Sequence, residues 1–581
     1  MAKSTDSFLK SLFFGQVDEE LIFPFPGLDP DVAETVGMIN DSVDRFAQEN
    51  VKSSEWDAAA AMPEDIVQKV SELGLMGLLV DEELGGMGLP MMAYSRIFEN
   101  LATHDASLTV TVGAHQSIGY KGLLLFGSPA QKEKYLPRLA TGELIAAFCL
   151  TEPSSGSDAA SIKTVATPTE DGTAYSISGS KLWITNGGIA DFLTVFAKVP
   201  VEVDGEIKEK VTAFMVDVPS EGISVGPEEH KMGIKASWTN EIHFENVIVP
   251  AENIIGEVGK GFKVAMGILN HGRLGLAGGC VGGMKKCIAA SLEHANQRRQ
   301  FKKRLIEFGM VQDKISKMTT NLYAAESMVY FTTHLIDRGD LDYSLESAAA
   351  KVFASEALWE AIDETIQIWG GNGFMKEYPF EQWMRDARIY RIFEGTNEIL
   401  RAFVALSGMQ GPGEELAGLA DAIKHPLKGL GQVGDYAVRR FKMTSVGSES
   451  IESAHPSLNK IAGQVEEITA EFAEQVDVAL RRYGKKIFLE QLIQKRLADV
   501  AIDLFGMIAV LSRTTAVINE KGVENAQLEI SVSQSFCQQA RRRCWGNLKG
   551  ISRNDDELTR SIAEQVSEVG EYPFGNQILG V

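Results

Sequence analysis

The sequence predicts a mainly α-helical protein with one β domain, in the order helical, β, helical, linker and helical. Apolar residues recur at helical spacing before residue 148 and again after residue 255. Between these points, short runs rich in β-branched and aromatic residues are separated by turns. A chain of 581 residues is too long for one core, so we expect several domains.

The N-terminal part is predicted to be helical. Residues 1–30 form an N-terminal extension, and residues 31–147 form an N-terminal α-helical domain. Within this domain, residues 131–139 have the pattern of a short amphipathic helix that ends at Gly142.

Residues 148–255 are predicted to form the β domain. The candidate strands are Tyr175–Ser178, Phe192–Ala197, Val211–Val216 and Glu241–Val249. Turn sequences such as Asp171-Gly172 separate them. Several short strands within one such segment favour a small barrel or a sandwich.

Residues 256–410 return to helical periodicity. Their long helices are predicted near 262–298, 310–338, 344–370 and 397–407, which indicates a bundle. We expect Gly408 to end the last of these helices. Residues 411–455 are rich in Gly, Ala, Lys and Arg, and we interpret them as a linker or a membrane-binding segment. Residues 456–581 are predicted to form an extra C-terminal helical domain.

The composition argues against several functions. The chain has 56 basic and 79 acidic residues, a net charge of −23, and nucleic-acid binding depends on positive surface. Its five cysteines are scattered and odd in number, so we expect no metal site and a reducing compartment. No continuous apolar run reaches the ~18–20 residues of a membrane span, and the N-terminus lacks the features of a targeting peptide. We therefore expect a cytoplasmic protein.

Glu394 is the candidate catalytic residue. It lies on a short connector, two residues before Thr396, which is a good N-cap for the following helix. Ile392 and Phe393 surround it with apolar groups, and a carboxylate in such surroundings should have a raised pKa. This would suit a base that removes a weakly acidic proton. The alternative is a solvated loop glutamate.

Three further segments carry candidate binding residues. Phe148–Asp158 combines small hydroxylated residues with a glycine, which would let main-chain N–H groups approach an anion, or it is a plain turn. Lys181–Gly188 offers Trp183 as a flat surface for a planar cofactor, or as a core tryptophan. Gln367–Phe374 contains three glycines, of which a helix end explains only one.

In this order and spacing, the segments resemble the acyl-CoA dehydrogenase family. The resemblance covers residues from about 30 to 410 and is closest to the very-long-chain members, because it continues into residues 491–503. It implies a helical domain, a middle β-barrel and a C-terminal four-helix bundle with FAD between them, followed by an extra helical domain. It also implies a reaction, the first step of fatty acid β-oxidation. Glu394 removes the α-proton of an acyl-CoA, the β-hydride passes to the flavin, and a trans-2-enoyl-CoA results.

The resemblance also implies roles for single residues. Those that would bind FAD in the same chain are Phe148, Cys149, Leu150, Thr151, Ser155, Gly156, Ser157, Trp183, Ile184, Thr185, Thr396, Asn397 and Glu398. Those that would reach the FAD of a neighbouring subunit are Arg298, Gln367, Ile368, Trp369, Gly370 and Gly371. Those that would bind substrate are Ser157, Asn270, His271, Gly272, Arg273 and Gly395. Some family members carry the base at the position of Gly272, so here only Glu394 remains for this role.

Further expectations concern partners. The resemblance implies a homodimer, an electron-transfer flavoprotein as electron acceptor, and a long-chain acyl-CoA substrate. Gly119 would deepen the acyl tunnel, and each added buried CH₂ contributes ~0.8 kcal/mol. Residues 413–445 form a basic amphipathic segment that would attach peripherally to anionic lipid, at the mitochondrial inner membrane if the protein is eukaryotic. The alternatives are a respiratory-complex assembly factor of the same family and an acyl-CoA oxidase.

Overall fold

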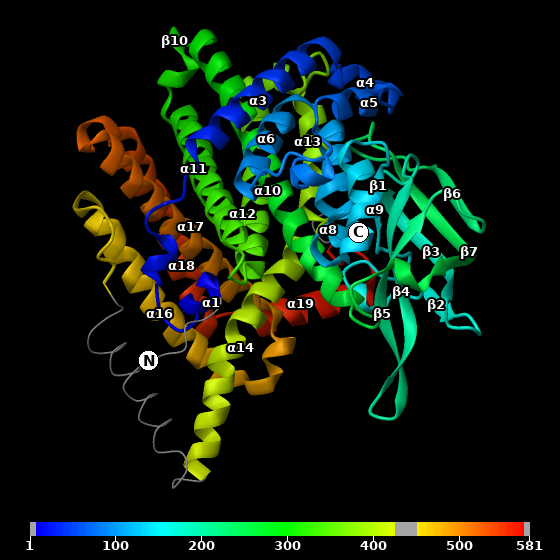
Figure 1. Ribbon diagram of the computed structural model, residues 1–581. Coiled ribbons are helices and arrows are strands. Elements are labelled where there is room, and N and C mark those ends of the chain that lie inside the picture. Colours follow the sequence, from blue (N-terminus) through cyan, green and yellow to red (C-terminus); the bar gives the residue numbers. More distant parts are fainter. Residues whose placement is uncertain (1–6, 425–449, 575–581) are drawn as a thin grey trace.

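The computed structural model describes residues 7–424 and 450–574, and it confirms a mainly helical protein with one β domain (Figure 1). The long helices of the bundle run through the centre of the molecule. The sheet lies at one side of them, and most of the C-terminal helical domain lies at the opposite side.

The N-terminal part is helical, as predicted. Its helices are α1 (Phe8–Leu12), α2 (Glu19–Ile22), α3 (Pro30–Asn50), α4 (Ser53–Ala59), α5 (Ile66–Glu72), α6 (Met91–His104), α7 (Ala106–Gly113), α8 (Lys121–Phe126) and α9 (Pro129–Ala140). A π-helical turn, η2 (Ala114–Gly119), joins α7 to α8. Helix α9 starts with a capping box, in which Ser128 and Gln131 each accept a hydrogen bond from the other's main-chain N–H.

The β domain is an eight-stranded sheet. Its strands are β1 (Ala146–Cys149), β2 (Val165–Pro168), β3 (Ala174–Thr185), β4 (Phe192–Val203), β5 (Glu206–Asp217), β6 (Ile223–Glu228), β7 (Thr239–Pro250) and β8 (Ile254–Ile255). The order is β6-β7-β3-β2-β4-β5-β8, and β1 pairs in parallel with β4. A separate two-stranded hairpin, β9 (Arg299–Gln300) and β10 (Lys303–Arg304), follows the first bundle helix.

The central strand β4 shows why this segment folds as a sheet buried on both faces. Phe192 and Phe196 belong to a core shared with α8, α9 and α10. Leu193, Val195 and Ala197 point the other way, into a core made by the strands themselves. This alternation is the two-residue period of a strand, and both sets are apolar because both faces are covered.

The bundle contains α10 (Gly261–Gln297), α11 (Gly309–Arg338), α12 (Ser344–Trp369) and α14 (Asn397–Lys424), with the short α13 (Phe380–Arg388) before α14. The prediction that Gly408 ends the last helix is wrong, because α14 continues to Lys424. A Cβ at Gly408 would collide with the ring of Phe13, which follows α1. The glycine thus permits close packing of the N-terminal extension on α14, and part of the predicted linker is helical.

The C-terminal domain consists of α16 (Asn459–Tyr483), α17 (Gln491–Lys521), α18 (Gln527–Ser552) and α19 (Asp556–Val569). Helix α17 is long and apolar enough to cross a membrane by length and composition, but most of its apolar stretch is buried within the fold. The ring of Phe8 in α1 packs against Phe331 of the bundle and Phe505 of α17, with centroid distances of 5.5 and 5.9 Å. The N-terminal extension therefore joins the bundle to the C-terminal domain.

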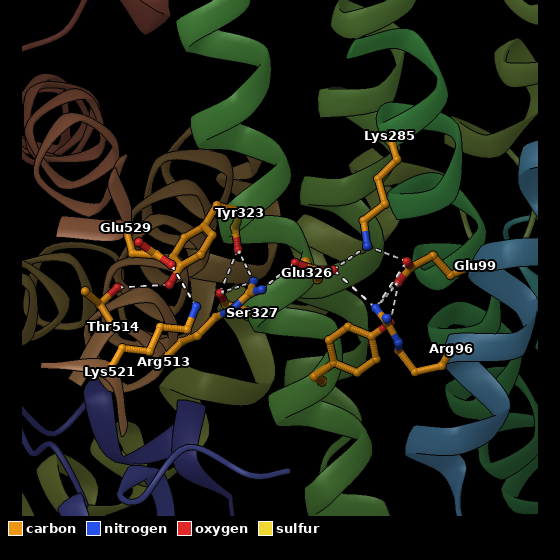
Figure 2. A network of polar contacts seen from close by, with 11 residues as sticks. Arg96, Glu99, Lys285, Tyr323, Glu326, Ser327, Arg513, Thr514, Lys521 and Glu529 are labelled. Carbon is orange, nitrogen blue, oxygen red and sulfur yellow. Dashed lines mark hydrogen bonds and ion pairs between the residues drawn. The ribbon is translucent and has the colours of Figure 1, made fainter. Parts of the chain in front are cut away.

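A network of charged side chains also fastens the C-terminal domain to the rest of the protein (Figure 2). Glu326 of α11 accepts a hydrogen bond from Lys285 of α10 at 2.5 Å and pairs with Arg513 of α17 at 2.6 Å. Lys285 also pairs with Glu99 of α6, and Arg96 of α6 lies 3.4 Å from Glu326. Helices from three domains therefore meet at this network.

Glu326 stays ionised within the network. Burial alone would raise its pKa, but Arg513 and Lys285 outweigh burial and hold the pKa of Glu326 at about 2. Because this lies below the ordinary value of 4.5, the ionised group stabilises the fold above pH 4.5. That contribution, about 3 kcal/mol, is lost as the pH falls towards 2.

We predict that Glu326→Gln lowers the free energy of unfolding at pH 7 by about 3 kcal/mol, because it leaves Arg513 and Lys285 without their shared anion. The matched control is Glu529→Gln, which breaks the more exposed 3.3 Å pair with Lys521 and should cost less than ~1 kcal/mol. Urea unfolding of both variants measures the difference. Equal losses would contradict a stabilising role for the network.

Candidate active site

Glu394 lies on a short connector between a 3₁₀ turn at Ile389–Arg391 and the start of α14. Thr396 caps α14, as predicted, by accepting a hydrogen bond from the main-chain N–H of Ile399 at 3.3 Å. Glu394 has a φ of 58°, a left-handed conformation that is costly for a residue with a side chain. The connector is therefore strained and has to be held by its surroundings.

Two buried cations hold this connector through its main-chain carbonyls. Arg273 Nε donates a hydrogen bond to the carbonyl of Glu394 at 3.1 Å. Lys351 Nζ donates to the carbonyl of Gly395 and to Asn397 Oδ1, both at 2.8 Å. Sequence reasoning missed Lys351, although a single lysine in the otherwise apolar stretch Ala348–Ala354 was a usable signal.

The Glu394 side chain is partly buried, and one of its carboxylate oxygens is fully enclosed. Its Oε2 atom has no hydrogen-bond partner among the described residues. A Cβ at Gly272 would lie 2.7 Å from this oxygen, so a side chain at that position would crowd it. Burial raises the pKa of Glu394 to about 7, although the nearby charges of Arg273 and Lys351 act to lower it. The alternative of a solvated loop glutamate is therefore wrong.

The predicted substrate segment Asn270–Arg273 divides between two faces of α10. Arg273 is buried, and its Nη1 donates to Asn270 Oδ1 at 2.7 Å, so Asn270 positions the arginine. Gly272 faces the carboxylate of Glu394. His271 instead packs edge-on against Tyr343, and burial lowers the pKa of His271 to about 3, so it is neutral. Its side chain does not join the Glu394 cluster.

Asn397 and Glu398 also have different environments. Asn397 Nδ2 donates to Ser355 Oγ and to Glu356 Oε1, both at 3.1 Å, and its Oδ1 accepts from Lys351. The amide of Asn397 is thus used inside the protein, and only its main chain can serve a cofactor. Glu398 is exposed in the first turn of α14.

The loop after β1 is fixed to strand β3 by a buried ion pair. Lys181 Nζ lies 2.7 Å from Glu152 Oε1, and both side chains are buried. Glu152 also accepts hydrogen bonds from the N–H and the hydroxyl of Thr164, at 3.0 and 2.6 Å. The N–H of Leu182 donates to the carbonyl of Thr151 at 2.9 Å. The two predicted segments are therefore joined, and sequence reasoning missed the pair that joins them.

Trp183 lies in a β-bulge with a φ of 58° and is 61% exposed. The bulge turns this side chain out of the sheet, since the pairing of β3 with β7 shifts between Lys181 and Ile184. The alternative of a core tryptophan is therefore wrong. An uncovered indole of this kind can serve as a flat surface for a planar ligand.

Several predicted cofactor residues face the core instead. Cys149 and Ile184 belong to the interior core of the sheet, Leu150 is buried beside α8, and Phe148 packs on Phe196 with a centroid distance of 5.2 Å. The side chains of Cys149, Leu150 and Ile184 are buried, so a cofactor can contact these residues only through their main chain, whereas Phe148 is partly exposed. Thr151 and Thr185 are partly exposed.

The turn at Ser155–Ser157 has the geometry of an open cradle. Ser155 Oγ donates to the carbonyl of Asp158 at 2.5 Å, which closes the turn. Gly156 and Ser157 are exposed, and a Cβ at Gly156 would meet nothing within 4 Å. The exposed main chain of this turn can approach an anionic group such as the pyrophosphate of FAD, and the uncovered ring of Trp183 can face a flat ligand.

The second group of predicted FAD residues forms a separate surface cluster. Trp369 stacks on His294 at 4.3 Å, near the end of α10, where Arg298 follows. Gly370 has a φ of 59°, and both it and Gly371 face open space, while Gln367 is exposed and Ile368 is buried. Arg298 lies 25 residues beyond Arg273, roughly 37 Å along α10. This cluster therefore does not join the Glu394 cluster of its own chain.

Comparisons with family models cover most of the chain. The acyl-CoA dehydrogenase N-terminal, middle and C-terminal domains match residues 33–143, 147–247 and 259–409. The ACAD9/ACADV C-terminal domain matches residues 456–572. The chain is 44% identical to the mitochondrial very long-chain specific acyl-CoA dehydrogenases of rat and human, over 98% of this chain and 89% of each relative.

Solved structures agree with these matches. An acyl-CoA dehydrogenase from Bacillus anthracis, complexed with FAD, has a TM-score of 0.78 at 33% identity, covering 97% of this chain and 95% of its own. Butyryl-CoA dehydrogenase from Megasphaera elsdenii has a TM-score of 0.62 at 35% identity, covering 66% of this chain and 99% of its own. The chain belongs to the acyl-CoA dehydrogenase family of FAD-dependent oxidoreductases.

Proposed function

We propose that this enzyme dehydrogenates long-chain fatty acyl-CoA thioesters to trans-2-enoyl-CoA, with Glu394 as the base. The observation that carries this assignment is the Glu394 carboxylate, whose Oε2 atom is buried with no hydrogen-bond partner among the described residues and whose pKa is raised to about 7 by burial. The α-proton passes to Oε2, and the pair of electrons left on the α-carbon forms the new double bond. FAD, when bound, supplies the acceptor for the β-hydride.

The residues around Glu394 serve the proton transfer. Arg273 and Lys351 bind the carbonyls of the connector and leave the carboxylate oxygens unengaged. They fix the position of the base without neutralising it, and proton transfer depends on such positioning. Exclusion of water around the carboxylate keeps its pKa close to the working pH.

We predict that Glu394→Gln retains bound FAD but lowers kcat by at least ~10²–10⁴-fold, because the general base is lost. In the unaltered enzyme, kcat/KM for palmitoyl-CoA should fall as the pH drops through about 7, where Glu394 becomes protonated. Glu377→Gln changes an exposed glutamate and serves as the control. Near-normal turnover of Glu394→Gln would refute the assignment.

The substrate range is proposed from the relatives. That Gly119 deepens the acyl tunnel stays a prediction. A Cβ there would lie 2.8 Å from the side chain of Ala146 and 2.7 Å from the carbonyl of Ala114, so the glycine also allows η2 to pack closely on β1. The preference for long chains is supported by the 44% identity to very long-chain specific enzymes.

We predict that kcat/KM rises with chain length from octanoyl-CoA to chains of about C14 or more, because each buried CH₂ adds ~0.8 kcal/mol of binding. The measurement is a series of saturated acyl-CoA substrates with an electron-transfer flavoprotein, the proposed acceptor. A maximum at octanoyl-CoA would contradict this range. Peroxide production in place of flavoprotein reduction would indicate an oxidase.

The cluster of Arg298 and Gln367–Gly371 is proposed to complete the FAD site of a second subunit in a homodimer. This proposal is supported by the roughly 37 Å of helix between Arg298 and Arg273, which separates the cluster from the Glu394 site of its own chain.

We predict that Arg298→Ala weakens FAD retention at least ~10-fold, since a charged hydrogen bond is lost, whereas Arg299→Ala does not. FAD binding is measured by fluorescence after gel filtration. A monomer with stoichiometric FAD would contradict the proposal.

Peripheral membrane attachment through residues 413–445 is also proposed, and residues 425–449 lie outside the described part of the chain. Five cations against two anions between Asp421 and Ser445, in a chain of charge −23, support attraction to anionic lipid.

We predict that the protein sediments with cardiolipin-containing vesicles at low salt. Binding that survives deletion of residues 425–445 would refute a role for this segment.

A further inference from the structure

Helix α13 leads into the connector of the base and is also fastened to the β domain. A 3₁₀ turn follows its last residue, Arg388, and the connector that carries Glu394 comes directly after this turn. In the β domain, α13 contacts the loop of residues 229–238, which joins β6 to β7. The same short helix is thus attached both to the segment of the base and to the β domain.

Three contacts join the loop to α13. Asp386 Oδ1 accepts a hydrogen bond from the main-chain N–H of Ile234 at 2.5 Å, and Arg385 Nη1 donates to the carbonyl of Met232 at 3.1 Å. A Cβ at Gly233 would lie 2.3 Å from the carbonyl of Arg385, so the two main chains lie very close. Ile234 has a φ of 44°, a left-handed conformation that is costly for a β-branched residue. The contact with α13 therefore holds the loop in a strained conformation.

The other end of the loop is bonded to the proposed flavin-binding segment Lys181–Gly188. The carbonyl of Trp238 accepts a hydrogen bond from the main-chain N–H of Asn186 at 2.8 Å. Asn186 is fully buried and directly follows Thr185. The contacts therefore run without a break from the base, through α13 and the loop, to the segment that carries Trp183.

The loop is cross-linked between these two points. Ser237 donates its N–H and its hydroxyl to the carbonyl of Ile234, at 3.2 and 2.8 Å. Lys231 Nζ donates to the carbonyl of Ser237 and to the hydroxyl of Thr239. Trp238 is partly buried and packs against the core of the helices. A displacement at Ile234 is therefore passed on to Trp238 and is not absorbed within the loop.

We propose that Asp386 is a positioning residue, which aligns the flavin-binding segment with the base through the N–H of Ile234. In the proposed reaction the substrate lies between the two, because it loses a proton to Glu394 and a hydride to the flavin. A misplacement of about 1 Å far from the reacting atoms can cost on the order of 10²-fold in rate. The inference rests on the proposed function and adds the contact that fixes the spacing of its two halves.

The contact needs an oxygen acceptor but no charge. Burial raises the pKa of Asp386 to about 7, and the charges of Asp105 and Asp57 act in the same direction, whereas Arg385 acts to lower it. An amide oxygen can accept the hydrogen bond of the Ile234 N–H as well. Asp386→Asn therefore keeps the contact, and Asp386→Ala removes it.

The test compares Asp386→Ala, Asp386→Asn and Asp503→Ala in the FAD-loaded enzyme. Asp503 of α17 is a buried carboxylate that pairs with Arg543 at 2.6 Å, so its loss destabilises the C-terminal domain and leaves the loop intact. One readout is hydrogen–deuterium exchange of main-chain amides, and the other is the rate of flavin reduction by palmitoyl-CoA without oxygen. In Asp386→Ala, exchange should become faster in residues 232–238 and 185–188, and flavin reduction should slow by about 10²-fold at unchanged FAD content.

Both readouts should stay close to those of the unaltered enzyme in Asp386→Asn and in Asp503→Ala. Normal flavin reduction in folded Asp386→Ala overturns the proposal. An equal slowing in Asp503→Ala also overturns it, because the effect would then reflect a general loss of stability. Turnover that persists in Glu394→Gln overturns the proposed function, and it leaves the exchange result for Asp386→Ala as a separate observation.

A second variant covers the case in which Asp386→Ala does not fold. Gly233→Ala should push the loop away from α13, because its Cβ would meet the carbonyl of Arg385, and it should reproduce both changes. The control is Gly226→Ala, whose Cβ would lie 3.4 Å from the Cβ of Glu241, an ordinary contact. Normal flavin reduction in Gly233→Ala likewise overturns the proposal.

Discussion

The close approach of α10 to its neighbours is the constraint on which the active site depends. A Cβ at Gly282 would collide with the main-chain carbonyl of Glu99 on α6, and one at Gly272 would crowd the base. Glycine in a helix costs roughly 0.5–1 kcal/mol relative to alanine, so the packing gained at these positions has to offset that cost. In return, α10 can lie directly against α6 and place Arg273 beside the Glu394 connector.

The site also depends on where its cations bind. Arg273 and Lys351 attach to the carbonyls of Glu394 and Gly395, not to the carboxylate. A cation hydrogen-bonded to the carboxylate itself would lower the pKa by about 1–3 units and leave a weak base. By holding the main chain, the two cations maintain a strained φ of 58° while burial keeps the pKa of Glu394 near 7. The two cations thus fix the position of Glu394 and lower its pKa only through their charge, which burial outweighs.

Local signals in the sequence predict the parts of this arrangement that depend on neighbouring residues. The Thr396 cap is one example, and the change from helical to strand period near residue 148 is another. The side chain of Ile392, predicted to enclose Glu394, is instead 46% exposed. Local sequence misleads where a distant segment decides. The sequence predicts that Gly408 ends a helix, but the ring of Phe13, from a segment about 400 residues away, explains it as a close-packing position. The partners of Lys351 and Glu152 are likewise distant in sequence, so pairing could not be inferred from spacing.

The extra C-terminal domain has a supporting role in this scheme. A shorter relative matches 66% of this chain, so the dehydrogenase fold itself does not require that domain. Without Arg513, Glu326 would still face Lys285 and Arg96, and Glu99 would keep the same two cations. The domain thus contributes one cation to a network that already exists, and that network holds α6 against α10 and α11. Asp499 of α17 also pairs with Arg401 of α14 at 2.6 Å, so the domain braces the helix that begins at the Glu394 connector as well as α6.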